Sequence, residues 1–401
     1  MPSSKSRKDL IDLHRLSRTP AEAYLRRQAR PSSPRRKAGT IVKRPLLGSF
    51  SPMHQAKWVT EYVVHRLGHR HAFLDYSQTG DDNGIYRLEG HHGEVRIALA
   101  GDWATGTDEA HEVAQLMKRY QPHYTIHLGD VYFVGDVTEV GENFLGINNE
   151  ENGYEPCAWP MGSHGSFALN GNHEMYALGY AYFDHMLPKL GLCVDGKQVG
   201  QHASFFCLEN DHWRIIALDT AFNSVGWPMI EYFSKPDARL PEPLMQWLRD
   251  EVQLRPDDPR GIILMSHQQY VSRFEDCFDV PARQLAPFIG HPVLWFWGHE
   301  HRMAIYEEAG LPDNIRALGR CVGHGGMPVE LSPAKPRHPE YKVEFVDDRL
   351  YPNDENLKIG YNGFARMTFR GPQLSVDYVD IEGTVVFSEV WQVDKGALTR
   401  R

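Results

Sequence analysis

The chain has 401 residues, of which 41% are hydrophobic and 24% are charged. This ordinary globular composition excludes fibrous, collagen-like and wholly disordered proteins. No run of 18 consecutive apolar residues occurs, so the sequence predicts no transmembrane helix. The first thirty residues contain no apolar stretch typical of a secretory signal, and the five cysteines form no CxxC pair. We therefore expect free thiols and a cytoplasmic location.

The charge is divided unevenly along the chain. Residues 1–50 hold 13 Lys or Arg and three acidic residues, a net charge of +10, which leaves −19 for the rest. The basic stretch 1–48 has little to bury, so we expect a disordered N-terminal extension before a single domain at 49–401. Two interpretations of the extension stay open: a solvated tail, or an arm that makes weak contact with nucleic acid or an anionic surface.

The N-terminal part of the domain, residues 49–93, is expected to hold a helix and a hairpin. Apolar residues recur at helical spacing from Trp58 to Leu67. The turn residues Thr79 to Gly84 lie between two short strand candidates.

The core, residues 94–330, begins with an apolar strand at 95–100, a helix at 108–120 and a second strand at 124–128. These lengths predict a βαβ unit with parallel strands. Further strands are expected at 167–169, 213–218, 262–265 and 293–297, with a helix opened by Pro243.

The last part, residues 331–401, combines a Pro-rich insertion with a closing antiparallel meander. The meander is predicted from alternating strands at 364–369, 373–379 and 384–392. Another surface insertion is expected at 137–164, where its place in the chain would allow it to cover a site.

Six polar residues follow the predicted strands closely: Asp102, Asp130, Asn172, His267, His299 and His301. In open α/β sheets, ligands bind at the carboxyl ends of the strands. Each of these residues alone is equally well explained by a turn or a helix cap. Turns and helix caps do not explain why all six occur in this order. The sequence therefore predicts that they converge on one metal site.

At these residues the chain resembles a known family. The blocks are Gly101-Asp102, Gly129-Asp130, Gly171-Asn172-His173-Glu174, Ser266-His267 and Gly298-His299-Glu300-His301. They are similar, in the same order, to the five blocks of the calcineurin-like metallophosphoesterase superfamily. Gly-Asp-Trp at 101–103 and Gly-Asp-Val-Tyr-Phe-Val-Gly at 129–135 look most like the purple acid phosphatase-like branch. The resemblance implies an α/β fold, a four-layer αββα sandwich of two mixed β-sheets flanked by helices.

The resemblance also implies a dinuclear metal centre. It assigns Asp102 and His301 to the first metal, Asn172, His267 and His299 to the second, and Asp130 to both. A bridging ligand needs two oxygens with lone pairs, which a carboxylate offers. His, Asp and Asn ligands without Cys suit Fe, Mn or Zn. The implied reaction is hydrolysis of phosphomonoesters or phosphodiesters by in-line attack of a metal-bridging hydroxide.

Four further residues are candidates for catalysis or substrate binding. By resemblance, His173 protonates the leaving oxygen or stabilises charge on the phosphoryl group. Glu174 either orients that imidazole or is an acidic residue at a helix N-terminus. His324, in a Gly-rich turn, either reaches the substrate or belongs only to the turn. Arg302 either grips a phosphate or forms a surface ion pair.

Two positions depart from the family pattern. Many members have a first-metal histidine where this chain has Ala104. Purple acid phosphatases supply a tyrosine where this chain has Phe133, while the nearest tyrosine is Tyr132. Neighbouring strand residues point to opposite faces, so Tyr132 becomes a metal ligand only if a bulge or a shifted loop turns it inward.

Two alternatives to a general phosphoesterase stay open. A nuclease or cyclic-nucleotide phosphodiesterase would use the same constellation, although the acidic body is a poor surface for nucleic acid. A non-catalytic scaffold that binds a phospho-ligand would tolerate Ala104 and Phe133. Against the scaffold, His173 and all the second-metal candidates are present, and a scaffold has no need of that set.

Overall fold

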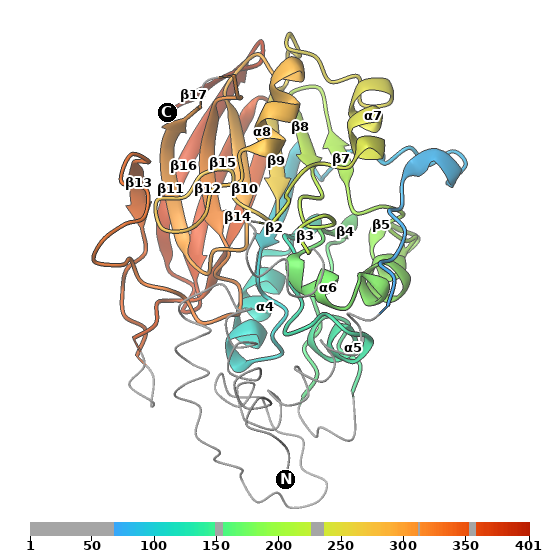
Figure 1. Ribbon diagram of the computed structural model, residues 1–401, viewed down its shortest axis with the longest axis vertical. Coiled ribbons are helices and arrows are strands. Elements are labelled where there is room, and N and C mark those ends of the chain that lie inside the picture. The colour runs from blue at the N-terminus through green and yellow to red at the C-terminus, as the bar shows by residue number, and fades with distance from the viewer. Residues whose placement is uncertain (1–67, 149–154, 226–235, 312, 353–357) are drawn as a thin grey trace, which may run out of the picture.

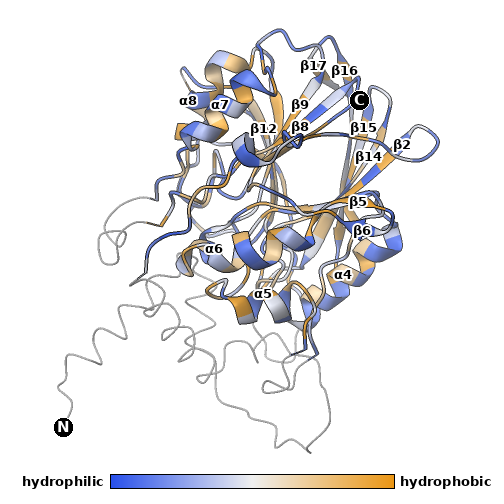
Figure 2. Cartoon of the chain, turned by 90° about the vertical axis from the view of Figure 1, so that its right-hand side faces the viewer, coloured by the Kyte–Doolittle hydropathy of each residue, from blue (hydrophilic) through white to orange (hydrophobic). Residues whose placement is uncertain are grey.

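The computed structural model describes residues 68–148, 155–225, 236–311, 313–352 and 358–401. Two β-sheets pack face to face, and helices cover the outer face of each (Figures 1 and 2). This is a four-layer αββα sandwich, so the predicted fold is confirmed. The basic stretch 1–48 and the helix expected at 58–67 lie outside the described residues. Contact of that stretch with nucleic acid or an anionic surface therefore stays a prediction.

One sheet has nine strands among the described residues. In spatial order they are β17 (Ala397–Arg400), β16 (Val385–Asp394), β15 (Gln373–Asp380), β14 (Gly363–Arg370), β2 (Glu94–Ala100), β3 (Tyr124–His127), β4 (Gly165–Ala168), β5 (Gly191–Val194) and β6 (Lys197–Gln198). The neighbours β2, β3 and β4 run parallel, as the predicted βαβ unit requires. The meander from β14 to β17 is antiparallel as expected, and β14 pairs with β2.

The other sheet has eight strands among the described residues. In spatial order they are β1 (Ile85–Arg87), β7 (Phe206–Glu209), β8 (Trp213–Ala217), β9 (Gly261–Ser266), β10 (Val293–Trp297), β12 (Ala317–Val322), β11 (Met303–Ala309) and β13 (Val343–Val346). The strands β8, β9, β10 and β12 form its parallel centre.

The hairpin expected within residues 49–93 is wrong. A 3-10 helix, Tyr76–Gln78, precedes the turn, and β1 after the turn pairs in parallel with the distant β7. The hydroxyl of Tyr76 donates to the Phe205 carbonyl at 2.7 Å, and its ring packs into the core. The chain does turn at residues 79–84, as the sequence predicts. However, β1 pairs with a strand from a remote part of the chain.

The helices lie in two outer layers, which Figure 2 shows on opposite sides of the sheets. Their bounds are α4 (Asp108–Tyr120), α5 (Val137–Asn143), α6 (Asn172–Tyr176), a π-helical turn (Ala181–Met186), 3-10 turns (Leu187–Lys189 and Ala286–Phe288), α7 (Glu242–Asp250) and α8 (Val280–Leu285). Thr107 caps α4 by accepting from the Ala110 N–H, and Val113 and Met117 pack on the nine-stranded sheet. The helices α7 and α8 cover the eight-stranded sheet.

Part of the stretch 137–164 belongs to the core rather than to a surface insertion. Phe144 and Trp159 are buried and stack with ring centroids 5.7 Å apart. Residues 149–154 lie outside the described part, so a covering role for this stretch stays a prediction. None of the described helices has both the length and the apolar character that crossing a membrane requires. The cytoplasmic location stays a prediction as well.

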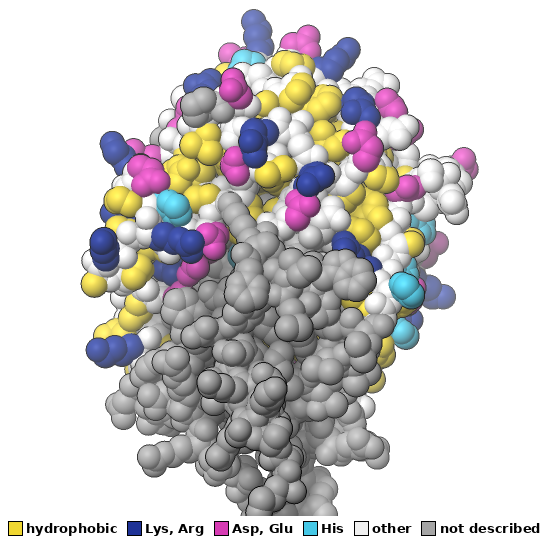
Figure 3. Space-filling model, viewed as in Figure 1, with side chains coloured by type: hydrophobic (Ala, Val, Ile, Leu, Met, Phe, Trp, Pro, Cys, Tyr) yellow, Lys and Arg dark blue, Asp and Glu magenta, His cyan; other side chains and the backbone are white. Residues whose placement is uncertain are grey.

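The described surface carries both signs of charge. In Figure 3, Lys and Arg side chains are interspersed with Asp and Glu over the described part of the face in view. A surface of mixed sign lacks the concentrated positive potential that attracts a phosphate backbone.

Candidate metal centre

The six predicted ligands lie where the carboxyl ends of the two parallel strand sets meet. Asp102, Asp130 and Asn172 follow β2, β3 and β4, whereas His267, His299 and His301 follow β9 and β10. The sheets approach closely at this seam, since the Gly101 N–H donates to the Val322 carbonyl at 3.1 Å. A Cβ atom at Gly101 would lie only 2.9 Å from the Gly298 Cα, so the approach needs glycine. Each sheet therefore supplies half of the constellation.

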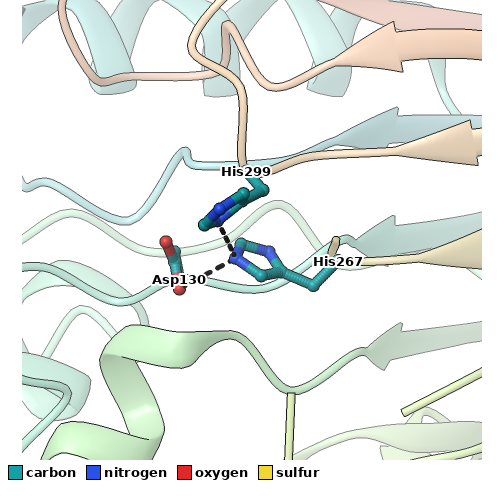
Figure 4. A group of neighbouring side chains, drawn as sticks. All are labelled: Asp130, His267 and His299. Carbon is teal, nitrogen blue, oxygen red and sulfur yellow. Dashed lines mark hydrogen bonds and ion pairs between the residues drawn. The ribbon is translucent and has the colours of Figure 1, made fainter. Parts of the chain in front are cut away.

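His267 is at the centre of one group of these side chains (Figure 4). Its Nε2 lies 3.0 Å from Asn172 Oδ1, 3.2 Å from His299 Nδ1 and 3.3 Å from Asp130 Oδ1. Its other ring nitrogen, Nδ1, lies 2.9 Å from the Leu128 carbonyl, which can only accept. Nδ1 therefore carries the proton, and the lone pair of a neutral His267 is at Nε2.

The donor set of this group fits a metal ion. A neutral His267 directs a lone pair at the oxygens of Asn172 and Asp130, which also offer lone pairs, an arrangement that a cation stabilises. His299 Nδ1 can join as a ligand in the tautomer that leaves it unprotonated. Without an ion, a proton takes that place. Burial lowers the pKa of His267, but the Asp130 carboxylate outweighs burial and raises it to about 9. Ligand atoms of Asp130, His267 and His299 all lie within 4.8 Å of one another.

A second group surrounds the Tyr132 hydroxyl. Its oxygen lies 2.6 Å from Asp102 Oδ1, 2.9 Å from His301 Nε2 and 3.1 Å from Asp130 Oδ2. His301 Nε2 is also 3.4 Å from Asp102 Oδ1. In this group, the single hydroxyl proton of Tyr132 faces two carboxylates, and His301 Nε2 is a further ligand atom in the tautomer that leaves it unprotonated. Its oxygen and nitrogen donors suit a transition metal.

The loop after β3 explains how Tyr132 points inward. Residue 131 forms an isolated bridge with Ala104, and the Tyr132 N–H donates to the Ala104 carbonyl at 3.0 Å. These residues lie beyond the end of β3, so the alternation of a regular strand does not apply to them. The shifted loop that Tyr132 required is present. The Tyr132 hydroxyl therefore lies beside Asp102 and His301, the two residues predicted to bind the first metal.

Asp130 connects the two groups. Its Oδ1 faces His267 and its Oδ2 faces Tyr132, and its backbone φ is +75°. The main chain of Gly171 packs so closely on this carboxylate that a Cβ atom there would overlap Oδ1. Burial alone would raise the pKa of Asp130, but His267 and His173 hold it well below its usual range.

His173 lies beside this carboxylate without being one of the six. Its Nδ1 lies 2.6 Å from the Phe133 carbonyl, so Nδ1 carries a proton and Nε2 faces the site, 3.7 Å from Asp130 Oδ2. The ring centroid is 4.3 Å from that of Tyr132. The backbone carbonyls of Leu128 and Phe133, which fix two imidazoles, were missed by the sequence reasoning because every residue has a carbonyl.

Glu174 does not orient the imidazole of His173. Its Oε2 accepts from the backbone N–H groups of Gly171 at 3.1 Å and Asp130 at 3.2 Å, in a capping-box arrangement at the start of α6. The carboxyl thus ties the loop after β3 to the loop after β4. Burial, and then the charge of Asp130, raises the pKa of Glu174 to about 8.

Arg302 is not on the surface, which corrects one of its two predicted roles. It is 1% exposed, and its Nη2 donates to Glu330 at 2.9 Å while its Nε lies 3.3 Å from Glu300. Its guanidinium lies over the Phe274 ring at 4.3 Å. The guanidinium is buried beside two carboxylates, so the geometry favours a buried ion pair over a grip on phosphate.

His324 belongs to a turn that packs against Asp102. The Gly325 N–H donates to the Gly101 carbonyl, and the Met327 N–H to the Asp102 carbonyl, both at 3.0 Å. The His324 carbonyl accepts from Asn362 and Gly363, and burial lowers the pKa of its imidazole to about 4. Asp347 and then Asp102 oppose that shift, so the imidazole lies within electrostatic reach of one of the six predicted ligands.

A comparison with models of known protein families gives one match. Residues 95–303, more than half of the chain, match the family model described as calcineurin-like phosphoesterase. A search of curated protein sequences found no match.

Several solved structures match over most of this chain at low sequence identity. GAP50, the anchor in the inner membrane complex of Plasmodium, is 14% identical with a TM-score of 0.46, over 76% of this chain and 91% of that one. Purple acid phosphatase PPD1 from yellow lupin seeds is 13% identical with a TM-score of 0.49, over 78% and 56%. A dimetal phosphatase from Danio rerio is 11% identical with a TM-score of 0.38, over 76% and 98%. On the family match, the chain belongs to the calcineurin-like phosphoesterase family.

Proposed function

We propose that this protein is a metal-dependent phosphoesterase with a dinuclear centre. The observation that carries the proposal is the pair of donor groups that share Asp130, with one carboxylate oxygen facing each group. Asp102, His301 and Tyr132 would hold the first ion. Asn172, His267 and His299 would hold the second. The participation of Tyr132 supports placing the chain near the purple acid phosphatase-like branch.

The ions suited to these donors are Fe, Mn or Zn. When bound, they supply Lewis acidity that activates a water molecule for in-line attack and screens the charge of the phosphoryl oxygens. Asp130 holds its charge at the centre because its pKa is far below neutrality. The Leu128 carbonyl keeps the Nε2 lone pair of His267 directed at the same place.

His173 would deliver a proton to the leaving oxygen. The Phe133 carbonyl fixes its ring, and Nε2 faces the carboxylate that both donor groups share. The Asp and His side chains of the constellation are assigned to the metals and to proton transfer, so we expect direct hydrolysis by water without a covalent phosphoenzyme. Glu174 acts here as a positioning residue for the two loops.

Elemental analysis and two chromogenic esters test the proposal. We expect about two metal ions per chain, and hydrolysis of p-nitrophenyl phosphate or bis-p-nitrophenyl phosphate. The better substrate distinguishes a monoesterase from a diesterase. His173→Ala should keep the metal content while kcat falls by about 10²–10⁴-fold, the usual contribution of a general acid.

The exposed His185 on the π-helical turn provides a matched control. His185→Ala should hydrolyse both esters at the wild-type rate. Wild-type protein that retains fewer than two ions and hydrolyses neither ester under added Mn, Fe or Zn would contradict the proposal. The non-catalytic scaffold would then be favoured, with Ala104 and Phe133 as its basis.

A further inference from the structure

Tyr176 contacts two members of the proposed centre at once. It is the last residue of α6, four positions after Asn172, so both side chains lie on one side of the helix. Its hydroxyl accepts a hydrogen bond from the Asn172 amide at 3.1 Å. Its ring centroid lies 4.9 Å from that of His173 at an interplanar angle of 59°. The side chain is half-buried, at the edge of the centre.

The hydrogen bond decides which end of the Asn172 amide faces the centre. An amide has an oxygen with lone pairs at one end and a nitrogen without a free lone pair at the other, and only the oxygen binds a metal. Nδ2 donates to Tyr176, so Oδ1 points to His267 Nε2 at 3.0 Å. Without an acceptor at Tyr176, the amide could turn over and present its NH₂ group to the ion.

The ring contact confines the imidazole of His173. That imidazole contacts two aromatic rings, with the Tyr132 centroid at 4.3 Å and the Tyr176 centroid at 4.9 Å. The Phe133 carbonyl fixes one ring nitrogen, and the two rings restrict rotation about that bond. A proton donor must hold a narrow range of positions to be effective in the transition state.

We propose that Tyr176 is a positioning residue with two separable roles. Its hydroxyl sets the orientation of Asn172, and its ring holds His173 against the shared carboxylate. This inference rests on the proposed function, since it assigns Tyr176 a role only toward a bound metal and a leaving group.

Two substitutions separate the roles. Tyr176→Phe keeps the ring and removes the acceptor, so we expect the dissociation constant of the second metal ion to rise about 10–100-fold, as for other partners of metal ligands. At saturating metal its kcat should stay within about threefold of wild type, because His173 is still confined. Titration of metal-free protein with Mn²⁺ or Zn²⁺ measures the affinity without turnover.

Tyr176→Leu removes the ring as well. It should show the same loss of metal affinity and, at saturating metal, a new dependence on the leaving group. Phenol is a poorer leaving group than p-nitrophenol and depends more on protonation. We therefore expect phenyl phosphate hydrolysis to fall about tenfold more than p-nitrophenyl phosphate hydrolysis.

Tyr180→Phe is the control, because Tyr180 lies four residues further on and is 45% exposed. It should leave metal affinity and both rates unchanged. Unchanged metal affinity in Tyr176→Phe would overturn the role of the hydroxyl, and equal losses on both esters in Tyr176→Leu would overturn the role of the ring. Failure of the wild type to bind metal or hydrolyse ester would contradict the proposed function itself, which keeps the two failures distinct.

Discussion

The Tyr132 hydroxyl lies within hydrogen-bonding distance of side chains from three separate segments. Asp102 follows β2, Asp130 follows β3 and His301 follows β10. At the scale of single residues, this is the feature that most distinguishes the centre from the family pattern. The backbone bond to Ala104 helps to hold the loop that places the phenol there.

We expect Tyr132→Phe to weaken one metal site selectively. The ring still fills its place, but the first-metal group loses an oxygen donor, so one of two metal equivalents should dissociate more readily by more than about tenfold. Protein loaded with ferric ion should absorb visible light through the phenolate, and the variant should not. Metal titration and an absorption spectrum measure both effects.

Tyr86→Phe serves as the comparison. It removes a hydroxyl that donates to Asp82, away from the centre. This variant should keep both metal equivalents and the visible band. Two ions bound equally tightly by Tyr132→Phe would show that the phenol is only a neighbour of the first ion.

At the scale of elements, a ligand beyond a strand is placed by the turn that follows it. Arg302 leads from the turn carrying His299 and His301 into β11, and its buried guanidinium joins Glu300 of that turn to Glu330. The Glu330 N–H also donates to the His301 carbonyl at 2.7 Å. This buried ion pair connects the turn that carries His299 and His301 to the segment after β12.

Arg302→Met should destabilise the fold without changing substrate affinity. Methionine retains much of the apolar stem but leaves two buried carboxylates without their cation, which typically costs about 3–5 kcal/mol. Urea unfolding measures the loss, and KM should remain that of the wild type. Arg316→Met, which removes an exposed partner of Glu308, should cost less than about 1 kcal/mol. A raised KM with unchanged stability would instead favour a grip on phosphate.

The strands, and the convergence of the six candidate ligands at the strand ends, were predictable because both depend on local spacing. An apolar run that ends in Gly-Asp, Ser-His or Gly-His predicts both a strand and a candidate ligand just beyond it. Contacts between remote segments were not predictable. The pairing of β1 with β7, the inward turn of Tyr132 and the burial of Arg302 each depend on a partner far along the chain. Local sequence carries no signal for such partners.

At the scale of the whole molecule, the edge of the nine-stranded sheet opposite the metal centre carries a cluster of three histidines. His91, His123 and His164 lie just before β2, β3 and β4, with ring centroids 4.8–5.0 Å apart. His123 Nδ1 accepts from the Arg96 N–H at 3.0 Å. Burial, and then His164, Arg96 and His91, lowers the pKa of His123 to about 4, with Glu94 opposing.

Acid should therefore weaken the fold through His123. A folded-state pKa below the unfolded value near 6.5 means that the unfolded chain gains the proton first, so stability falls as pH decreases from about 6.5 toward 4. His123→Asn keeps an acceptor for Arg96 but does not titrate. Urea unfolding of both proteins across this range, at a fixed metal concentration, should show a flatter pH dependence for the variant. Parallel curves would mean that other groups cause the acid sensitivity.

The seam between the sheets gives bound ions a mechanical consequence. The six predicted ligands divide equally between the two sheets, and Tyr132 would add a fourth from the nine-stranded sheet. An ion held between them would cross-link the two halves of the sandwich much as a disulfide joins two strands. Unfolding must separate those halves and release the ions, which links the free energy of unfolding to the concentration of free metal by mass action. In a cell short of transition metals, such a protein would become less stable as well as inactive. Its abundance would then follow the metal supply.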